Sequence, residues 1–369
     1  MGSISPFVKP ILTIFMLCFG PFVFGQTLST TVDGHTMVDP GSPTVLYSPF
    51  NWNVLSGAAS TINSGAYLRT LFGGTSISVL TDTSANMRPY SQLWVRVDGQ
   101  PWVQHKLSPH TTLNIASGLQ KRTHLMELIV KSTSETIPRW SNSATMVTIT
   151  GFVLDLGETL SLPQRRSKNI LIFGDSITEG VRTVNCDATE DTDRNDVLGD
   201  YSFAISTAFD AEVGIVAFGA SGFTRSGTGG VPPLPLSYNY LYAGVARRFN
   251  SPPPDLVIYN YGTNDGGNIA GPLQQVVNSI IDMVPNSKHH VLIPLNNSHS
   301  DDIAWAISAI ANSRVTHSAT AGFFDPRDSC DGLHPYNYSH LSLIAPRLFP
   351  AIRDLLYPSA APAGVSNGQ

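Results

Sequence analysis

Residues 168–178 read Lys-Asn-Ile-Leu-Ile-Phe-Gly-Asp-Ser-Ile-Thr, and this stretch decides the fold of the second part of the chain. Its apolar run has the length and composition of a strand that is buried on both faces. Four similar runs follow, separated by helix-like segments, which is typical of a parallel sheet covered by helices. The five runs lie at 169–173, 213–218, 255–261, 290–295 and 321–324. We therefore predict one doubly wound α/β domain at residues 161–357.

Helices are expected between these strands and after the last one. The candidate segments are 201–209, 238–248, 273–284, 301–312 and 339–356. The tail at 358–369 lacks apolar periodicity and is expected to be disordered.

In the first part of the chain, residues 26–160, the apolar residues are spaced differently. Short β-prone runs are broken by Gly, Pro, Ser and Asn, as at 76–80, 92–97 and 146–154. This spacing predicts an all-β sandwich or jelly roll. Exposed tryptophans could stack on sugars there, although filling the core of the sandwich is the commoner role. The tryptophans of this part are Trp52, Trp94, Trp102 and Trp140.

The N-terminus has the features of a secretory signal. Lys9 precedes an apolar run at 11–24 that is too short for a stable membrane span. We predict that residues 1–25 are removed before Gln26 and that the protein is secreted and extracellular, with an uncleaved anchor as the alternative. No later segment of the sequence is apolar enough to predict a membrane span in the mature chain.

The low fraction of charged residues and the negative net charge narrow the class of binding partner. Charged residues make up 13% of the chain and the formal net charge is −5, so no basic surface for nucleic acid is expected. We expect a monomer with a neutral partner.

Without the signal, Cys186 and Cys330 remain, an even pair that predicts one disulfide in an oxidising compartment. Two sequons predict glycosylation at Asn296 and Asn337.

The strand ends carry the residues of chemical interest, because ligands of open α/β sheets bind at the carboxyl ends of the strands. Four blocks of this kind follow the apolar runs. They are Gly174-Asp175-Ser176, Gly219-Ala220-Ser221-Gly222, Gly262-Thr263-Asn264-Asp265 and Asp331-Gly332-Leu333-His334-Pro335. In order and spacing these blocks resemble those of the SGNH or GDSL hydrolase superfamily, over about residues 169–357. The resemblance implies a flavodoxin-like, three-layer domain with a five-stranded parallel sheet.

The resemblance also implies a catalytic role for three of these residues. Ser176 would be the nucleophile, and His334 would be the general base that accepts its proton. Asp331 would orient the imidazole and stabilise its charged form. No cofactor and no metal are implied.

An oxyanion formed during acyl transfer needs preorganised hydrogen-bond donors. The resemblance assigns this role to the backbone N–H groups of Ser176 and Gly222 and to the side-chain amide of Asn264. Gly219 is the alternative to Gly222.

Each block also has a plainer interpretation. Ser176 or Thr178 could cap a helix, Asn264 could cap a turn, and 331–335 could be a β-turn. The glycine-rich segment 219–230 lacks the ending of a phosphate-binding loop. Four such blocks in this order favour the catalytic interpretation. The sequence contains neither a His-Glu-x-x-His zinc motif nor a Gly-x-Ser-x-Gly elbow.

An acidic insert occupies residues 185–200. It lacks the glycine and terminal glutamate of an EF-hand, so we predict a solvated loop over the site rather than a calcium site. A bridge from Cys186 to Cys330 would tie this insert to the loop of Asp331. The acids of the insert are Asp187, Glu190, Asp191, Asp193, Asp196 and Asp200.

The order of the two domains resembles carbohydrate esterase family 2 and similar deacetylases, which implies a substrate among plant cell-wall polysaccharides. Glu179 stands where that family usually has a cysteine, and some of its members lack an acid such as Asp331. We predict a serine carboxylic ester hydrolase that deacetylates polysaccharides or oligosaccharides through an acyl-enzyme on Ser176. The alternatives are an esterase or lipase on small or lipid esters, and a non-catalytic sugar-binding protein.

Overall fold

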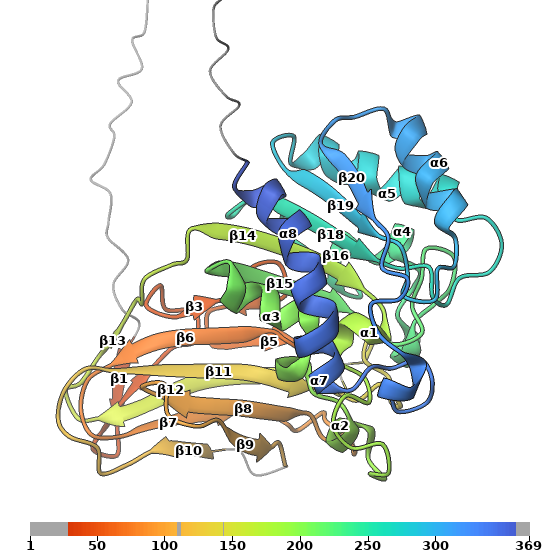
Figure 1. The fold of residues 1–369 in the computed structure, drawn as a ribbon. Coiled ribbons are helices and arrows are strands. Elements are labelled where there is room, and N and C mark those ends of the chain that lie inside the picture. The colour runs from red at the N-terminus through yellow and green to blue at the C-terminus, as the bar shows by residue number, and fades with distance from the viewer. Residues whose placement is uncertain (1–28, 109–111, 143, 359–369) are drawn as a thin grey trace, which may run out of the picture.

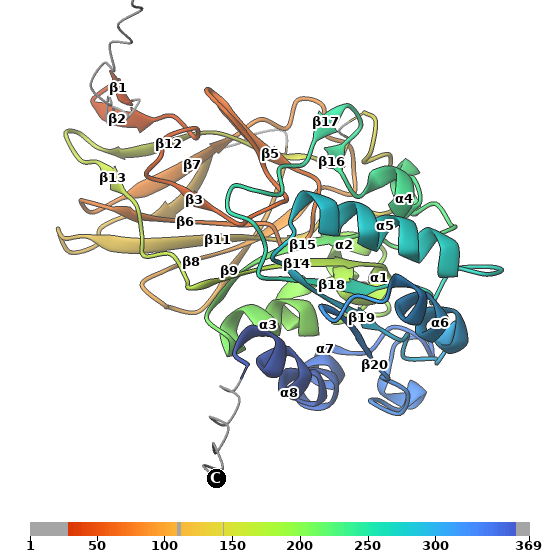
Figure 2. The same cartoon turned by 90° about the horizontal axis from the view of Figure 1, so that it is seen from above.

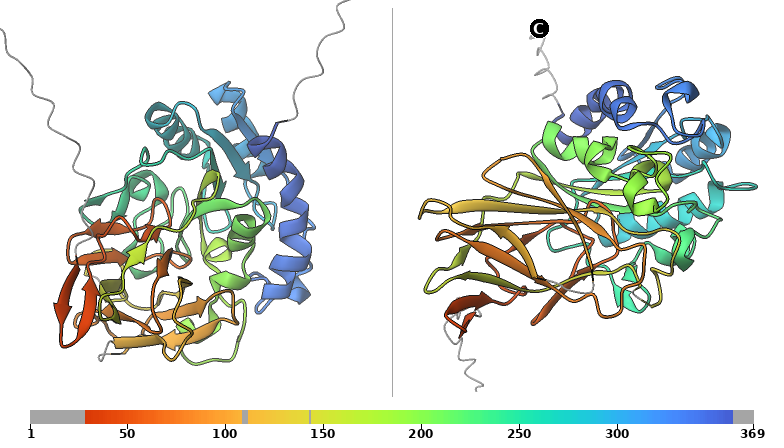
Figure 3. Two further views of the ribbon diagram at one scale, coloured as in Figure 1. Left: turned by 90° about the vertical axis from the view of Figure 1, so that its left-hand side faces the viewer. Right: turned by 90° about the horizontal axis from the view of Figure 1, so that it is seen from below.

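The computed structural model describes residues 29–108, 112–142 and 144–358. The predicted signal at 1–25 and nearly all of the predicted disordered tail lie outside the described residues. Two bodies lie side by side, a β-sheet domain formed by the first part of the chain and an α/β domain formed by the second (Figures 1 and 3).

The first domain consists of two antiparallel sheets packed face to face. One has seven strands and the other six. The seven-stranded sheet contains β1 (Ser29–Val32), β2 (His35–Val38), β4 (Asn53–Leu55), β5 (Ala58–Thr61), β7 (Ile77–Thr81), β10 (Thr112–Ala116) and β12 (Val147–Asp155). The six-stranded sheet contains β3 (Leu46–Tyr47), β6 (Tyr67–Phe72), β8 (Gln92–Val97), β9 (Val103–Lys106), β11 (His124–Ser132) and β13 (Leu160–Ser161).

The strands of this domain alternate between the core and the surface. In β7 the buried residues are Ile77, Val79 and Thr81, and Ile77 and Val79 share a core cluster with residues of the other sheet such as Leu68 and Leu128. This period of two is what a sandwich with one solvated face per sheet requires. The predicted all-β sandwich is confirmed, and β8 has the predicted bounds.

The second domain has one parallel sheet of five strands in the order β15-β14-β18-β19-β20. These strands are β14 (Lys168–Gly174), β15 (Ala211–Ala217), β18 (Leu256–Asn260), β19 (Lys288–Leu292) and β20 (Val315–Ser318). One face is covered by α5 (Ala270–Met283) and α6 (Ser300–Ile310). The other is covered by α3 (Tyr201–Ala208) and α8 (Ala345–Leu356) (Figure 2). The predicted three-layer α/β fold is confirmed.

The first domain covers the β15 edge of this sheet. The Asn51 side chain donates to the carbonyl of Ile215 at 3.3 Å, and the N–H of Val213 donates to the Tyr67 hydroxyl at 3.2 Å. Gly214 permits the close approach, because a Cβ there would lie 2.1 Å from the carbonyl oxygen of Pro49. An edge strand that would otherwise expose unpaired backbone groups is thereby satisfied.

Two predicted elements of the second domain are wrong. The strand expected at 321–324 is a turn, since Gly322 has a φ of +75°, and the fifth strand is β20. The helix expected at 238–248 is a hairpin of β16 (Tyr240–Tyr242) and β17 (Val245–Ala246), preceded by the short helix α4 (Leu234–Ser237). Gly244, with a φ of +78°, makes the turn that a helix could not contain.

Candidate active site

Ser176 stands at the first turn after β14. Asp175 is extended and caps the short helix α1 (Ser176–Glu179) by accepting the N–H of Ile177 at 3.0 Å. Burial raises the pKa of Asp175 to about 7, against the lowering effect of that hydrogen bond. Gly174 leaves room for the turn, because a Cβ there would lie 2.1 Å from the Thr178 hydroxyl. The Ser176 side chain is thus held at the carboxyl end of a central strand.

His334 and Asp331 complete a hydrogen-bonded row with this serine. His334 Nε2 lies 2.9 Å from Ser176 Oγ, and His334 Nδ1 lies 2.8 Å from Asp331 Oδ2. A neutral imidazole with its proton on Nδ1 leaves Nε2 free to accept from the serine hydroxyl. The structure therefore brings together the three residues that the sequence proposed for catalysis.

Asp331 is held as a carboxylate. It accepts the backbone N–H groups of Leu333 at 3.1 Å and His334 at 2.9 Å, and it forms an ion pair with Arg182. Partial burial alone would raise its pKa, but the hydrogen bonds from the backbone and imidazole of His334 lower that pKa to about 2. Arg182 was missed by the sequence analysis, since it follows α1 and no strand ends there.

The proposed oxyanion donors besides Ser176 lie on two loops, Gly222 after β15 and Asn264 after β18. Asn264 and Ala220 line the same pocket as Ser176. The Gly222 N–H donates to the carbonyl of Arg225 at 3.0 Å, and the Gly219 N–H donates to a buried carboxylate at 2.7 Å. An oxyanion would have to replace the Arg225 carbonyl to use Gly222, and that assignment stays a prediction.

The pocket over Ser176 has a volume of about 170 Å³, and six of its nine lining residues have polar or charged side chains. One lining side chain, Glu135, comes from the first domain, from the segment between β11 and β12. The strand ends of the sequence could not predict Glu135, because only the parallel sheet of the α/β domain is expected to place ligand-binding residues at the carboxyl ends of its strands. The lining residues are Glu135, Ser176, Val181, Arg182, Ala220, Thr228, Asn264, Leu333 and His334.

The acidic insert is tied down at several points. A disulfide joins Cys186 to Cys330, as predicted, and so links the insert to the residue before Asp331. The expected solvated loop is wrong for the part of the insert from Asp191 on, because Asp191 and Asp196 are 1% and 7% exposed, whereas Asp187 in its first part is exposed. Asp196 accepts the indole N–H of Trp94 at 3.0 Å, and Asp191 accepts donors from the first domain. These acids are used to pack the domains together.

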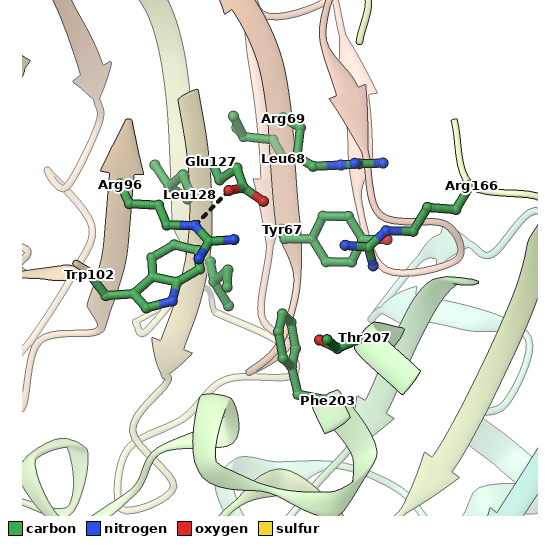
Figure 4. A pocket seen from close by; sticks show the side chains of 11 residues that line it. Tyr67, Leu68, Arg69, Arg96, Trp102, Glu127, Leu128, Arg166, Phe203 and Thr207 are labelled. Atoms are coloured by element: carbon green, nitrogen blue, oxygen red, sulfur yellow. Dashed lines mark hydrogen bonds and ion pairs between the residues drawn. The ribbon is translucent and has the colours of Figure 1, made fainter. Parts of the chain in front are cut away.

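A second cavity lies between the six-stranded sheet and α3. It has a volume of about 40 Å³, enough for one or two waters. Arg96 pairs with Glu127 at 2.6 Å and stacks over Trp102 at 4.2 Å, so its charge is already compensated (Figure 4). This cavity contains none of the predicted site residues.

The asparagines of both sequons, Asn296 and Asn337, are exposed, and their glycosylation stays a prediction. Within 29–108, 112–142 and 144–358, no helix is long and apolar enough to cross a membrane.

Comparison with known proteins defines the class of the second domain. A family model described as GDSL-like lipase/acylhydrolase matches residues 170–338. The second domain is therefore a GDSL-like lipase/acylhydrolase domain. This description supports a carboxylic ester hydrolase.

Individual proteins of similar sequence or structure include esterases whose names refer to carbohydrates. The cellulase/esterase CelE of Acetivibrio thermocellus is 26% identical over 193 residues, which are 50% of this chain and 23% of that protein. The chain thus spans about a quarter of that curated relative. A family two carbohydrate esterase from Cellvibrio japonicus has a TM-score of 0.75 at 20% identity, covering 87% of this chain and 97% of that one. A family two esterase from Clostridium thermocellum, in complex with cellohexaose, gives 0.71 at 20%, covering 85% and 99%. Both structures share the fold of the two domains together.

Proposed function

We propose that this chain is a secreted serine carboxylic ester hydrolase that removes acetyl groups from polysaccharides or oligosaccharides. The observation that carries the proposal is the row from Ser176 Oγ through His334 to Asp331, with contacts of 2.9 and 2.8 Å. A serine, a base and an orienting acid within hydrogen-bond reach are the requirements of acyl transfer through a covalent intermediate.

The reaction follows from this geometry in two halves. His334 Nε2 takes the proton of Ser176 Oγ as the oxygen attacks the ester carbonyl, and Asp331 stabilises the resulting imidazolium. The Asn264 amide and backbone N–H groups stabilise the oxyanion. The imidazolium then protonates the sugar oxygen as its bond to the carbonyl carbon breaks, so that the sugar departs as a free hydroxyl and an acyl-enzyme remains. In the second half His334 activates a water that releases acetate and restores Ser176.

The pocket favours a short acyl group on a polar alcohol. A volume of about 170 Å³ suits a small acyl group, and Glu135, Arg182 and Thr228 present polar atoms to the rest of the substrate. A lipid ester would need a continuous apolar wall, whereas only three of the nine lining residues are apolar. The carbohydrate esterases of similar fold support a sugar as the alcohol.

Secretion is proposed on separate grounds. Lys9 and the apolar run at 11–24 have the pattern of a cleavable signal, and a disulfide between Cys186 and Cys330 fits an oxidising compartment. N-terminal sequencing of the protein recovered from a culture medium should give Gln26. An intact Met1 would contradict cleavage.

The decisive experiment compares the wild type with Ser176→Ala on 4-nitrophenyl acetate and acetylated xylan, following released acetate. Ser279→Ala, on α5 and away from the pocket, is the matched control. The wild type and the control should release acetate, Ser176→Ala should not, and mass spectrometry should find an acetyl adduct on the Ser176 peptide. Glycan binding without turnover by the wild type would favour the sugar-binding alternative. Equal turnover by wild type and Ser176→Ala would remove Ser176 from the mechanism.

A further inference from the structure

The segment between β11 and β12 sends a second side chain toward the active site, and this one is completely buried. We propose that Arg139, a residue of the first domain, is a positioning residue of the active site. Through Glu179 it fixes the loop that follows β15 against the helical turn of Ser176. This inference rests on the proposed function, and its test is separable from that of the nucleophile.

The contact between Arg139 and Glu179 crosses from one domain to the other. Arg139 is 0% exposed and Glu179 is 1% exposed, and the two guanidinium nitrogens lie 2.5 and 3.2 Å from the two carboxylate oxygens. Such a two-point contact fixes orientation as well as distance. Glu179 ends the turn α1 that begins with Ser176, so the ion pair anchors the nucleophile's own helix.

The same carboxylate reaches the loop on the other side of the pocket. Its Oε2 accepts the N–H of Gly219 at 2.7 Å. Gly219 directly precedes Ala220, which lines the pocket, and is three residues before Gly222, the proposed oxyanion donor. One buried carboxylate therefore sets the spacing between the nucleophile and the loop.

Arg139 also holds the far end of that loop. Its guanidinium donates to the Thr228 hydroxyl at 2.8 Å, and its backbone N–H donates to the Gly229 carbonyl at 2.9 Å. The Thr228 N–H donates to the Gly219 carbonyl at 2.8 Å and so closes the loop. Gly229 is needed for this contact, because it has a φ of +67° and a Cβ there would lie 2.5 Å from Arg139 Cγ.

The charges explain why a guanidinium is needed here. Glu135 lies beside this pair, with its Oε2 2.4 Å from the position of a Cβ on Gly219. Burial and the neighbouring Glu179 raise the pKa of Glu135, and Arg139 acts against that rise. Without Arg139, two carboxyl groups would face each other beside the place where the oxyanion forms. A buried charge that loses its partner is strongly destabilising, whereas loss of both partners costs much less.

The test distinguishes an effect of Arg139 on the geometry of the active site from its effect on the stability of the protein. Arg139→Met should lower kcat for 4-nitrophenyl acetate by roughly 10- to 100-fold with little change in KM, less than the about 10²- to 10³-fold cost of losing an oxyanion donor itself. The double variant Arg139→Met with Glu179→Gln should regain most of the lost melting temperature, since residue 179 is then no longer a buried carboxylate without its partner. Its kcat should stay low, because the side-chain link from the Thr228 hydroxyl through Arg139 to residue 179 is still missing, and only the backbone bond from Thr228 to Gly219 remains.

Two further variants keep the test decisive. Arg139→Lys retains the charge but cannot span Glu179 and Thr228 together, so it should fold and still lose kcat, which covers a failure of Arg139→Met to fold. Arg247→Met is the matched control, because Arg247 is 5% exposed and also joins the domains, through the Phe50 carbonyl. It should lower the melting temperature and leave kcat unchanged.

Two results would overturn the inference. One is a kcat within about twofold of wild type for both Arg139 variants at a temperature where they are folded. The other is a kcat that recovers together with the melting temperature in the double variant, which a purely structural role predicts. Either result, together with an inactive Ser176→Ala, would leave the proposed function intact.

Discussion

Replacing both Cys186 and Cys330 by alanine should reduce stability much more than turnover. The bridge joins residues 144 positions apart, and the chain-entropy relation gives about 5 kcal/mol at 25 °C for a loop of that length. Native bridges typically contribute about 2–4 kcal/mol, so we expect a loss of about 3–5 kcal/mol. A chain of this size unfolds with an entropy of roughly 0.7 kcal/mol/K, which converts this loss into a fall in melting temperature of roughly 4–7 °C.

Turnover should change less, because Asp331 is held by other contacts. Its carboxylate accepts the N–H groups of Leu333 and His334 and pairs with Arg182. The two N–H contacts lie within the turn of Asp331 itself and survive the loss of the bridge, and the ion pair with Arg182 still joins this turn to the segment after α1. We expect kcat to fall by less than about tenfold, equivalent to less than about 1.4 kcal/mol of transition-state stabilisation.

The assay is thermal unfolding and 4-nitrophenyl acetate turnover at 25 °C for three samples. These are the wild type, the wild type with a phosphine reductant, and the double alanine variant. Reductant should lower the melting temperature of the wild type and have no effect on the variant, which controls for nonspecific effects of the reagent. An unchanged melting temperature and unchanged kcat in both perturbed samples would refute the reasoning.

The remaining predictions concern the site itself. Asp331→Asn should lower kcat by about 10²- to 10⁴-fold, because an amide permits the wrong imidazole tautomer; a fall of less than about threefold on 4-nitrophenyl acetate would argue against this role. Asn264→Ala should lower kcat by about 10²- to 10³-fold with a similar KM, whereas a rise in KM alone would make Asn264 a ground-state contact. The folded pKa of Asp331 is about 2, below its ordinary value of 3.8, so this carboxylate stabilises the fold above about pH 4 and that contribution disappears toward pH 2. Urea unfolding of wild type and Asp331→Asn should therefore show a stability difference that shrinks between about pH 5 and pH 2.5, and a constant difference would contradict the assignment.

Two residues of the candidate site, Ser176 and Asn264, were predictable because each follows a strand of the parallel sheet. Ser176 follows β14 and Asn264 follows β18, and parallel neighbours necessarily bring their carboxyl ends together. His334 was found through its motif rather than its strand, since the fifth strand ends at Ser318 and not near residue 324. The prediction succeeded there because the short block Asp331 to His334 is a local turn whose geometry does not depend on where the strand ends.

The elements that sequence reasoning misplaced have apolar composition but the wrong backbone. Residues 321–324 and 238–248 carry aromatic side chains that suggest buried structure, yet Gly322 and Gly244 both have positive φ. One glycine in a short apolar segment is ambiguous in a sequence, because it can end an element or lie within it. The tertiary contacts decide between these outcomes, and no local pattern encodes them.

The contribution of the first domain to the site was also invisible from the sequence, for a physical reason that applies to both of its anchors. Asp191 of the insert accepts the N–H groups of Glu135 at 2.7 Å and Thr136 at 3.2 Å, and Glu179 accepts the guanidinium of Arg139. Both contacts join residues 40 or more positions apart, and a charged residue in sequence reads as a surface residue unless its partner is known. Asp191 therefore holds the segment 133–140 through the N–H groups of Glu135 and Thr136, and Glu179, in the turn of the nucleophile, holds the same segment through Arg139. Glu135 therefore reaches the pocket on a rigid support, which is how a site holds a side chain precisely enough to contact a substrate.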